Sequence, residues 1–263
     1  MNPIIKISEL TKVYRVGENQ EAIIALDKVS IEQEEGGFLV IMGPSGCGKT
    51  TLLNVVAGFE TPDSGQCLVG GKNVMGPGPD RGVVFQEYAL FPWMTVERNI
   101  TFAMQAAGQW YDGGSARALD ILDRMGLSEF IHAFPKNLSG GMRQRVAIAR
   151  LIAINSPVML MDEPFGALDA LTRRNLQREL VALWRETKKT ILFITHSADE
   201  AIYLADRVLV MTPRPGKVVL SLKVELPRPR DPTSLEFNLL KRKILDVISP
   251  NDAAENGSFQ ISE

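Results

Sequence analysis

Short apolar runs of the length of β-strands recur along the whole chain. The two opening stretches, Ile4 to Tyr14 and Ala22 to Gln33, alternate or cluster apolar residues, and the turn Gly17-Glu18-Asn19 between them predicts an antiparallel pair. Further strands are predicted at Phe38 to Met42, Gln66 to Val69, Gly82 to Phe85, Val158 to Glu163, Thr190 to Thr195, Val208 to Met211 and Lys217 to Leu220.

Segments with apolar residues at helical spacing lie between these strands. The region from Glu87 to Pro157 changes to helices and loops and is predicted to be a helical insertion. Individual helices are predicted at Thr50 to Gly58, Ala116 to Gly126, from Ser139 to about Asn155, Leu171 to Lys188 and Leu235 to Ile248. Leu226 to Pro232 has the composition of a linker, and the polar tail after Ile248 is expected to be disordered.

Composition is that of an ordinary globular protein with no strong charge bias. The 263 residues are 45% hydrophobic and 23% charged, and 29 basic residues nearly cancel 31 acidic ones, so no footprint for nucleic acid is visible in the net charge. The apolar runs fall short of the roughly 20 residues that a membrane span needs. No secretory signal is expected at Met1 to Lys6, and two cysteines suit a reducing cytoplasm. Cys47, near a helix start, is either unusually reactive or an inert loop residue.

The apolar run that ends at Met42 leads into a glycine-rich loop. Gly43-Pro44-Ser45-Gly46-Cys47-Gly48 is followed by Lys49-Thr50-Thr51 at the start of a helical pattern, and a match to G-x-x-x-x-G-K-[ST] arises by chance in roughly one such chain in a hundred. Backbone N–H groups of such a loop surround phosphate, and the helix N-terminus adds positive potential. Lys49 would add a charge on the outer phosphates, and the Thr50 hydroxyl would reach a bridging Mg²⁺.

A second anion site is predicted where the later helix begins. Ser139 sits at an N-cap position, and Gly140 and Gly141 follow with N–H groups that can face an anion. Because the chain already has one phosphate loop, this second site is expected to serve the nucleotide of another molecule.

Polar residues end several of the predicted strands. Asp162 could hold the Mg²⁺ shell and Glu163 could accept a proton from water, although strands commonly end in acidic turns. Gln86 could aim its amide at the metal and water or be an ordinary surface residue. His196 could bind ligand at the carboxyl edge of a parallel sheet or be structural. Tyr14 could stack on a base or pack within its strand.

Large apolar residues gather beside prolines from Tyr88 to Val96. This stretch is either core of the helical insertion or a docking groove for another protein's helix.

Along nearly its entire length the chain resembles the ATP-hydrolysing subunit of ABC transporters. The phosphate loop, Gln86, the Leu138-Ser139-Gly140-Gly141 signature, Asp162-Glu163, Asp169 and His196 occur in the family's order. The resemblance implies an α/β P-loop fold with a mixed sheet core, a small antiparallel β-subdomain and an inserted helical subdomain at about 87–157. Residues 1–230 would form the ATPase domain and 231–263 a C-terminal amphipathic helix and tail. Met142 departs from the Gln of many members, but some importer subfamilies share it.

The resemblance also implies a role for each motif residue. Glu163, His196 and Gln86 would be catalytic, and Thr50, Gln86 and Asp162 would surround Mg²⁺. The residues implied in ATP binding are Tyr14, Gly43, Pro44, Ser45, Gly46, Cys47, Gly48, Lys49, Thr50, Thr51, Ser139, Gly140, Gly141 and Asp169. Two ATPase subunits, identical or paralogous, would face head to tail, with Ser139 and Gly141 on the ATP of the partner and Asp169 connecting the sites.

Less specific motifs resemble the nitrate, sulfonate and taurine importer group. They include Arg81 to Gln86, Phe91-Pro92-Trp93 and Met211 to Gly216. Partners would then be two transmembrane permease subunits, docked near Gln86 to Val96, and a solute-binding protein, at the cytoplasmic face of the plasma membrane. The alternative is a DNA-repair or translation-associated ATPase with the same engine, which would need a coiled coil, a basic face or a second copy.

Overall fold

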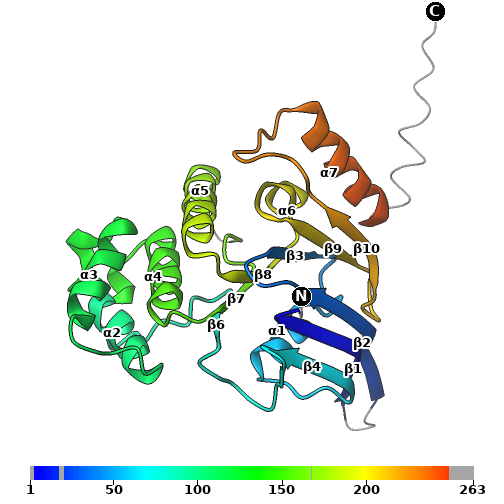
Figure 1. Ribbon diagram of the computed structural model, residues 1–263, viewed down its shortest axis with the longest axis horizontal. Helices are drawn as coiled ribbons and strands as arrows, with labels where there is room; N and C mark the ends of the chain where they lie inside the picture. The colour runs from blue at the N-terminus through cyan, green and yellow to red at the C-terminus, as the bar shows by residue number, and fades with distance from the viewer. Residues whose placement is uncertain (1–2, 18–20, 167, 249–263) are drawn as a thin grey trace, which may run out of the picture.

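The computed structural model describes residues 3–17, 21–166 and 168–248, and within them two β-sheets organise the fold (Figure 1). The smaller sheet is antiparallel, with the order β2-β1-β4-β5, and the larger one has the order β10-β9-β3-β8-β7-β6. Strands of the small sheet are β1 (Ile5–Val16), β2 (Glu21–Gln33), β4 (Ser64–Val69) and β5 (Lys72–Asn73). Strands of the large sheet are β3 (Phe38–Met42), β6 (Arg81–Val84), β7 (Val158–Asp162), β8 (Thr190–Thr195), β9 (Arg207–Met211) and β10 (Val218–Lys223).

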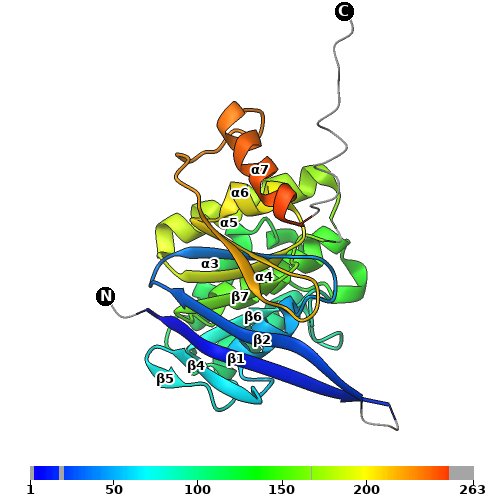
Figure 2. The same cartoon turned by 90° about the vertical axis from the view of Figure 1, so that its right-hand side faces the viewer.

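The large sheet is mixed, because β10 pairs antiparallel with β9 while the pairs β9–β3, β3–β8, β8–β7 and β7–β6 are parallel. This arrangement, together with the antiparallel second sheet, is the predicted α/β architecture. Figure 2 shows the long strands β1 and β2 of the small sheet crossing the side of the molecule that faces the viewer.

Seven α-helices surround the sheets in the described part of the chain. They are α1 (Lys49–Ala57), α2 (Val96–Ala106), α3 (Gly114–Arg124), α4 (Gly140–Ala153), α5 (Ala170–Thr187), α6 (Ala198–Leu204) and α7 (Leu235–Ile248). Helices α2, α3 and α4 pack together on one side of the molecule, away from the small sheet (Figure 1).

Strand β3 lies between two hydrophobic cores, and its successive side chains point alternately into one core and the other. Phe38, Val40 and Met42 face the core shared with the helices, whereas Leu39 and Ile41 face the core shared with α1 and the small sheet. All five side chains are fully buried, and each such burial stabilises the fold by about 1.5–3 kcal/mol. A continuous apolar run is therefore what a strand covered on both faces requires.

The parallel strands β3, β7 and β8 are neighbours, so their carboxyl ends meet at one edge of the sheet. The phosphate loop follows β3, Glu163 follows β7, and His196 follows β8. Open α/β sheets bind ligands at this edge. The strand order thus brings together the phosphate loop and two candidate side chains that lie more than a hundred residues from it in the sequence.

Most predicted strands and helices are confirmed with small shifts at their ends, but three features differ. The short strand β5 and the helix α6 lie where the sequence predicts neither a strand nor a helix. Leu226 to Pro232 is not a free linker, because Arg230 within it is buried and bonded to the rest of the fold. The turn at Gly17-Glu18-Asn19 and the tail 249–263 fall at least partly outside the described residues, and the division at residue 230 stays a prediction.

Candidate functional site

The loop from Gly43 to Gly48 holds Lys49 in a defined position. Gly48 is the N-cap residue of α1 and has a left-handed φ of 95°, and a Cβ there would lie 2.7 Å from the Ala25 carbonyl oxygen and from the Leu26 side chain. Only glycine meets both demands at that position. Lys49 is 6% exposed, and its Nζ donates to the carbonyl oxygens of Gly43 (2.8 Å) and Pro44 (3.1 Å). The ammonium is therefore placed over the loop, where it can meet an anion.

Thr50 and Asp162 bring a hydroxyl and a carboxylate together beside this loop. Burial raises the pKa of Asp162 above its usual value, and the Glu163 carboxylate adds to this effect, whereas the neighbouring Thr50 hydroxyl and Lys49 ammonium partly offset it. Oxygen donors of this kind suit Mg²⁺, which takes one or two protein ligands and completes its shell with phosphate and water. The pair therefore fits the predicted metal position.

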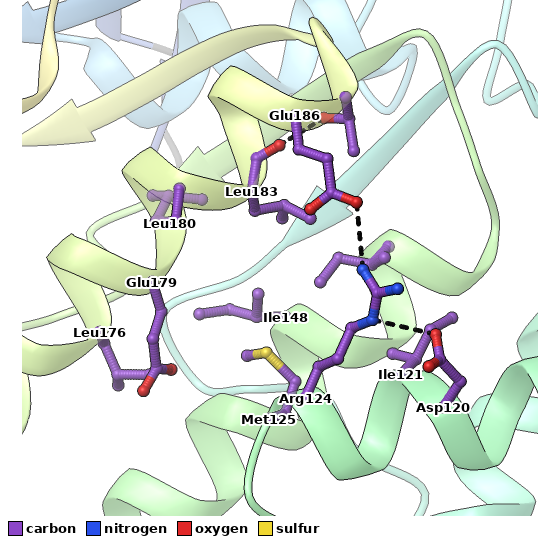
Figure 3. A pocket seen from close by; sticks show the side chains of 13 residues that line it. Asp120, Ile121, Arg124, Met125, Ile148, Leu176, Glu179, Leu180, Leu183 and Glu186 are labelled. Carbon is purple, nitrogen blue, oxygen red and sulfur yellow. Dashed lines mark hydrogen bonds and ion pairs between the residues drawn. The ribbon is translucent and has the colours of Figure 1, made fainter.

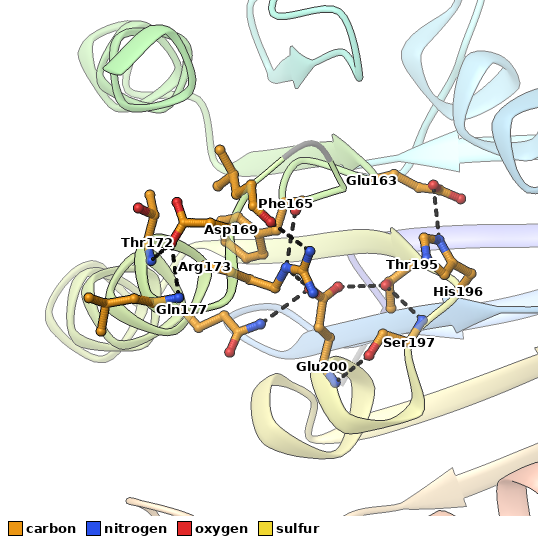
Figure 4. Close-up of polar contacts among 12 residues, drawn as sticks. Glu163, Phe165, Asp169, Thr172, Arg173, Gln177, Thr195, His196, Ser197 and Glu200 are labelled. Atoms are coloured by element: carbon orange, nitrogen blue, oxygen red, sulfur yellow. Dashed lines mark hydrogen bonds and ion pairs between the residues drawn. The ribbon is translucent and has the colours of Figure 1, made fainter. Parts of the chain in front are cut away.

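Glu163 and His196 meet at the carboxyl ends of β7 and β8 (Figure 4). His196 Nδ1 lies 3.1 Å from Glu163 Oε2, and the two side chains are 64% and 21% exposed. Glu163 has a left-handed φ of 42°, a strained conformation for a non-glycine residue, while its backbone N–H donates to the Ile194 carbonyl. Strain that is held by neighbouring strands fixes the carboxylate at the exposed edge, where it can contact water.

Ser139 and Asp169 both act as helix N-caps. The Ser139 hydroxyl accepts from the Met142 N–H (3.2 Å) at the start of α4, and one Asp169 oxygen accepts from Leu171 and Thr172 (3.1 and 3.0 Å) at the start of α5. Hydrogen bonds from Thr172 hold the pKa of Asp169 below its usual value. Both residues are exposed, so in one chain their side chains serve their own helices and face solvent.

Tyr14 and Gln86 lie at the margins of the site. The Tyr14 hydroxyl donates to Thr51 Oγ1 (3.4 Å), and Lys12 Nζ lies 5.4 Å from the centroid of its ring. Tyr14 is thus near the start of α1. Gln86 is exposed in the turn after β6. Cys47, by contrast, is fully buried, which favours the inert alternative for its thiol.

Sequence reasoning missed a network next to Glu163 and His196 (Figure 4). Glu200 on α6 accepts from Thr195 (2.6 Å), and Arg173 on α5 donates to the carbonyl of Leu168 (2.7 Å). The available signal was the capping-box spacing from Ser197 to Glu200, in which the Ser197 hydroxyl accepts from the Glu200 N–H (3.3 Å). Spacing alone gives no hint that the Glu200 carboxylate reaches Thr195 instead.

The apolar stretch from Tyr88 to Val96 lies at a surface groove between β6, α2 and α4. Phe91 lines this groove together with Phe102, and the two ring centroids are 5.2 Å apart. Trp93 is 69% exposed, with its ring centroid 5.6 Å from that of Phe91. Tyr88 and Leu90 pack partly against the core. The segment therefore combines both alternatives, with inner residues in the core and outer ones at a groove.

A separate cavity of about 270 Å³ lies between α3, α4 and α5 (Figure 3). Its walls are mainly apolar, and Arg124 forms ion pairs with Asp120 (3.0 Å) and Glu186 (3.2 Å) at the rim. None of the residues lining it belongs to the phosphate loop or to the Glu163 and His196 pair. The cavity is thus a gap between helices and no part of the candidate site.

Residues 26–166 match the ABC transporter family model. An uncharacterised ABC transporter ATP-binding protein of Methanocaldococcus jannaschii is 50% identical over 244 residues, covering 93% of this chain and 91% of its own length. The taurine import ATP-binding protein of Rhizobium johnstonii is 52% identical over 204 residues, 78% of each chain. No helix in the described ranges is long and apolar enough to span a membrane.

Two solved structures are similar in fold. A dimeric bacterial ABC transporter cassette has a TM-score of 0.76 and 33% identity, covering 85% of this chain and all of the other. A dimeric post-hydrolysis state of an ATP-binding cassette, bound to ADP and phosphate, has a TM-score of 0.74 and 32% identity with the same coverage.

Proposed function

The chain belongs to the ABC transporter family as an ATP-hydrolysing, ATP-binding subunit, and from that premise we propose that it powers import of a small anion, with taurine or a related sulfonate favoured over nitrate. The observation that carries this proposal is the similarity to taurine import ATP-binding proteins. Besides the relative from Rhizobium, that of Yersinia pestis is 49% identical over 200 residues.

ATP is proposed to bind across the loop Gly43 to Thr51. Backbone N–H groups and the N-terminus of α1 would surround its phosphates, with Lys49 as the positive charge and Tyr14 stacked on adenine. The support is the geometry of Lys49 and the closeness of Tyr14 to the start of α1. Thr50, Asp162 and Gln86 would hold Mg²⁺, which when bound neutralises charge on the phosphate oxygens.

Glu163 is proposed to orient the attacking water and accept its proton, with His196 contacting the γ-phosphate. A carboxylate fixed at the sheet edge and an exposed imidazole 3.1 Å away support this pairing. Gln86, in the exposed turn after β6, would contribute its amide to the same water. The chemistry requires little covalent participation by the protein, so positioning is the main contribution of these side chains.

A second ATPase subunit is proposed to complete each ATP site, head to tail. Exposed Ser139 and the half-buried Gly140 and Gly141 at the start of α4 would face the ATP of the partner, and Asp169 would connect the two sites. Two permease subunits would dock in the groove beside Phe91 and Trp93, and a solute-binding protein would deliver the substrate. This assembly would hold the chain at the cytoplasmic face of the plasma membrane.

The test is growth of a strain that lacks this chain on single sources of sulfur or nitrogen. We expect failure on taurine or alkanesulfonates as the sulfur source, restored by the wild-type chain and not by Glu163→Gln. Growth on sulfate is the control, because it bypasses sulfonate uptake. Failure confined to nitrate as nitrogen source would reassign the solute to nitrate, and normal growth on every source would contradict the proposed import role.

A further inference from the structure

Glu200 is a buried carboxylate at the centre of a polar network beside the hydrolytic residues. It is 7% exposed, one of its oxygens accepts from Thr195 Oγ1 (2.6 Å), and the other accepts from Gln177 Nε2 (3.2 Å). Thr195 Oγ1 in turn accepts from the Ser197 N–H (3.0 Å). Since Thr195 and Ser197 flank His196, the carboxylate fixes the backbone on both sides of the histidine.

Arg173 connects the same carboxylate to the loop that follows Glu163. Its Nε lies 3.7 Å from Glu200 Oε1 and donates to the Phe165 carbonyl (3.3 Å), and its Nη2 donates to the Leu168 carbonyl (2.7 Å). Figure 4 shows Arg173 pointing from α5 toward Glu200, between that loop and the end of β8. One guanidinium therefore holds two carbonyls of the stretch between Glu163 and Asp169.

We propose that Glu200 and Arg173 are positioning residues that couple the segment carrying His196 to the loop carrying Glu163 and Asp169. The inference rests on the proposed function, since it assumes that these three residues act in hydrolysis and in communication between subunits. A shift of either segment would be transmitted through the pair, because both segments bond to it directly. Hydrolysis at one site would thereby be linked to the position of the loop that approaches the other subunit.

If Glu200 and Arg173 only stabilised the fold, a Glu200 variant that folds normally would keep its kcat. Burial raises the pKa of Glu200, while Thr195, Arg173, His196 and Gln177 lower it, so the charge itself is the costly part of the buried group. Glu200→Gln removes this charge and keeps the shape of the side chain, so it tests the charge separately from the packing. Its amide oxygen can still accept from Thr195, but its NH2 group then faces the Arg173 guanidinium, which also has only donors, so the contact with Arg173 is lost.

The experiment compares Glu200→Gln with Asp199→Asn in steady-state ATP hydrolysis. Asp199 is the matched control, because it is the adjacent acidic residue on α6 and pairs with Lys241 on α7 rather than with the network. We expect Glu200→Gln to lower kcat at least tenfold, with the KM for ATP within twofold of the control and a melting temperature within about 2 °C of it. A kcat within twofold of the control overturns the proposal, as does a loss of kcat that merely follows a loss of folded protein.

Arg173→Lys provides a second variant if Glu200→Gln folds poorly. It retains the charge and loses the fork that reaches both carbonyls, so the same fall in kcat at unchanged KM is expected. Glu163→Gln separates the two levels of interpretation. Loss of hydrolysis in Glu163→Gln with normal hydrolysis in the other two variants removes only the positioning inference, whereas full hydrolysis in Glu163→Gln removes the proposed catalytic role of Glu163 on which the inference rests.

Discussion

The two cysteine side chains are buried, Cys47 in the phosphate loop and Cys67 in β4. Burial raises the pKa of both thiols, that of Cys67 to about 11, while Lys49 partly offsets the effect at Cys47. The thiolate is the reactive species, so at neutral pH both residues present little nucleophile and little access. The position of Cys47 near a helix start is thus outweighed by its burial.

Native protein is therefore expected to react slowly with iodoacetamide at pH 7.5, and unfolded protein to take up one label at each cysteine quickly. For Cys67 the sign follows from its raised pKa: each unit of pH below about 11 leaves roughly a tenth of the thiolate of the unit above it. Mass spectrometry of samples quenched at intervals measures the labelling, with protein in guanidinium as the control. Rapid labelling of native Cys47 would contradict this account.

Lys49, Thr50, Glu163 and His196 were predictable as candidates because each belongs to a short local pattern at the end of an apolar run. The contact between Glu163 and His196 was not, since it depends on β7 and β8 being neighbours in the sheet. Glu200 was missed for a related reason. Its partners come from α5 and from the end of β8, and sequence spacing reports on neither.

The segment from Leu226 to Arg230 connects the end of α6 with the chain that follows β10, through hydrogen bonds from Arg230. Arg230 is 5% exposed and donates to the carbonyl oxygens of Ile202, Tyr203 and Ala205 at the end of α6, and to those of Val224 and Leu226. The last carbonyls of a helix have no partner within the helix, and a cation there also interacts favourably with the helix dipole. Arg230 thus satisfies a helix end that would otherwise be buried without partners.

Arg230→Ala is expected to destabilise the protein by about 3 kcal/mol, because several buried carbonyls lose their donor at once. For a chain of this size that corresponds to a fall in melting temperature of roughly 5–10 °C. Differential scanning calorimetry measures it, with Arg242→Ala at an exposed position of α7 as the control. Equal melting temperatures for the two variants would show that water replaces the guanidinium without loss.

Strands and helices with a clear apolar pattern were predictable from the sequence. Segments that were assigned from their composition alone, such as Leu226 to Pro232, were not. Continuous runs such as Phe38 to Met42 have few options other than a buried strand. Prolines and arginines between Leu226 and Pro232 suggest an exposed linker, since arginine is rarely buried unless it is paired. The carbonyls that pair with Arg230 come from α6 and from the chain around Val224, so only the folded structure reveals them.

At the scale of the whole molecule, the α/β architecture with two sheets and a helical region agrees with the sequence prediction. The order β10-β9-β3-β8-β7-β6 places the ends of β3, β7 and β8 together, which the order of motifs along the chain does not state. The predicted roles of Ser139 and Asp169 at the ATP site are not accounted for by a single chain. Both are exposed helix caps, and their predicted contact with ATP requires a second subunit.

Glu163→Gln is expected to bind ATP, to hydrolyse it very slowly and to dimerise when ATP is present. Removal of the carboxylate leaves Lys49 and the loop intact, so ATP persists between the two subunits and holds them together. Size-exclusion chromatography with light scattering, with and without Mg-ATP, measures the dimer. The control is the double variant Glu163→Gln, Ser139→Arg, which places a bulky charge at the proposed interface while the loop that binds ATP is unchanged. We expect this double variant to bind ATP and stay monomeric. A Glu163→Gln chain that remains monomeric at saturating Mg-ATP contradicts the head-to-tail arrangement, and a control that dimerises equally well excludes Ser139 from the interface.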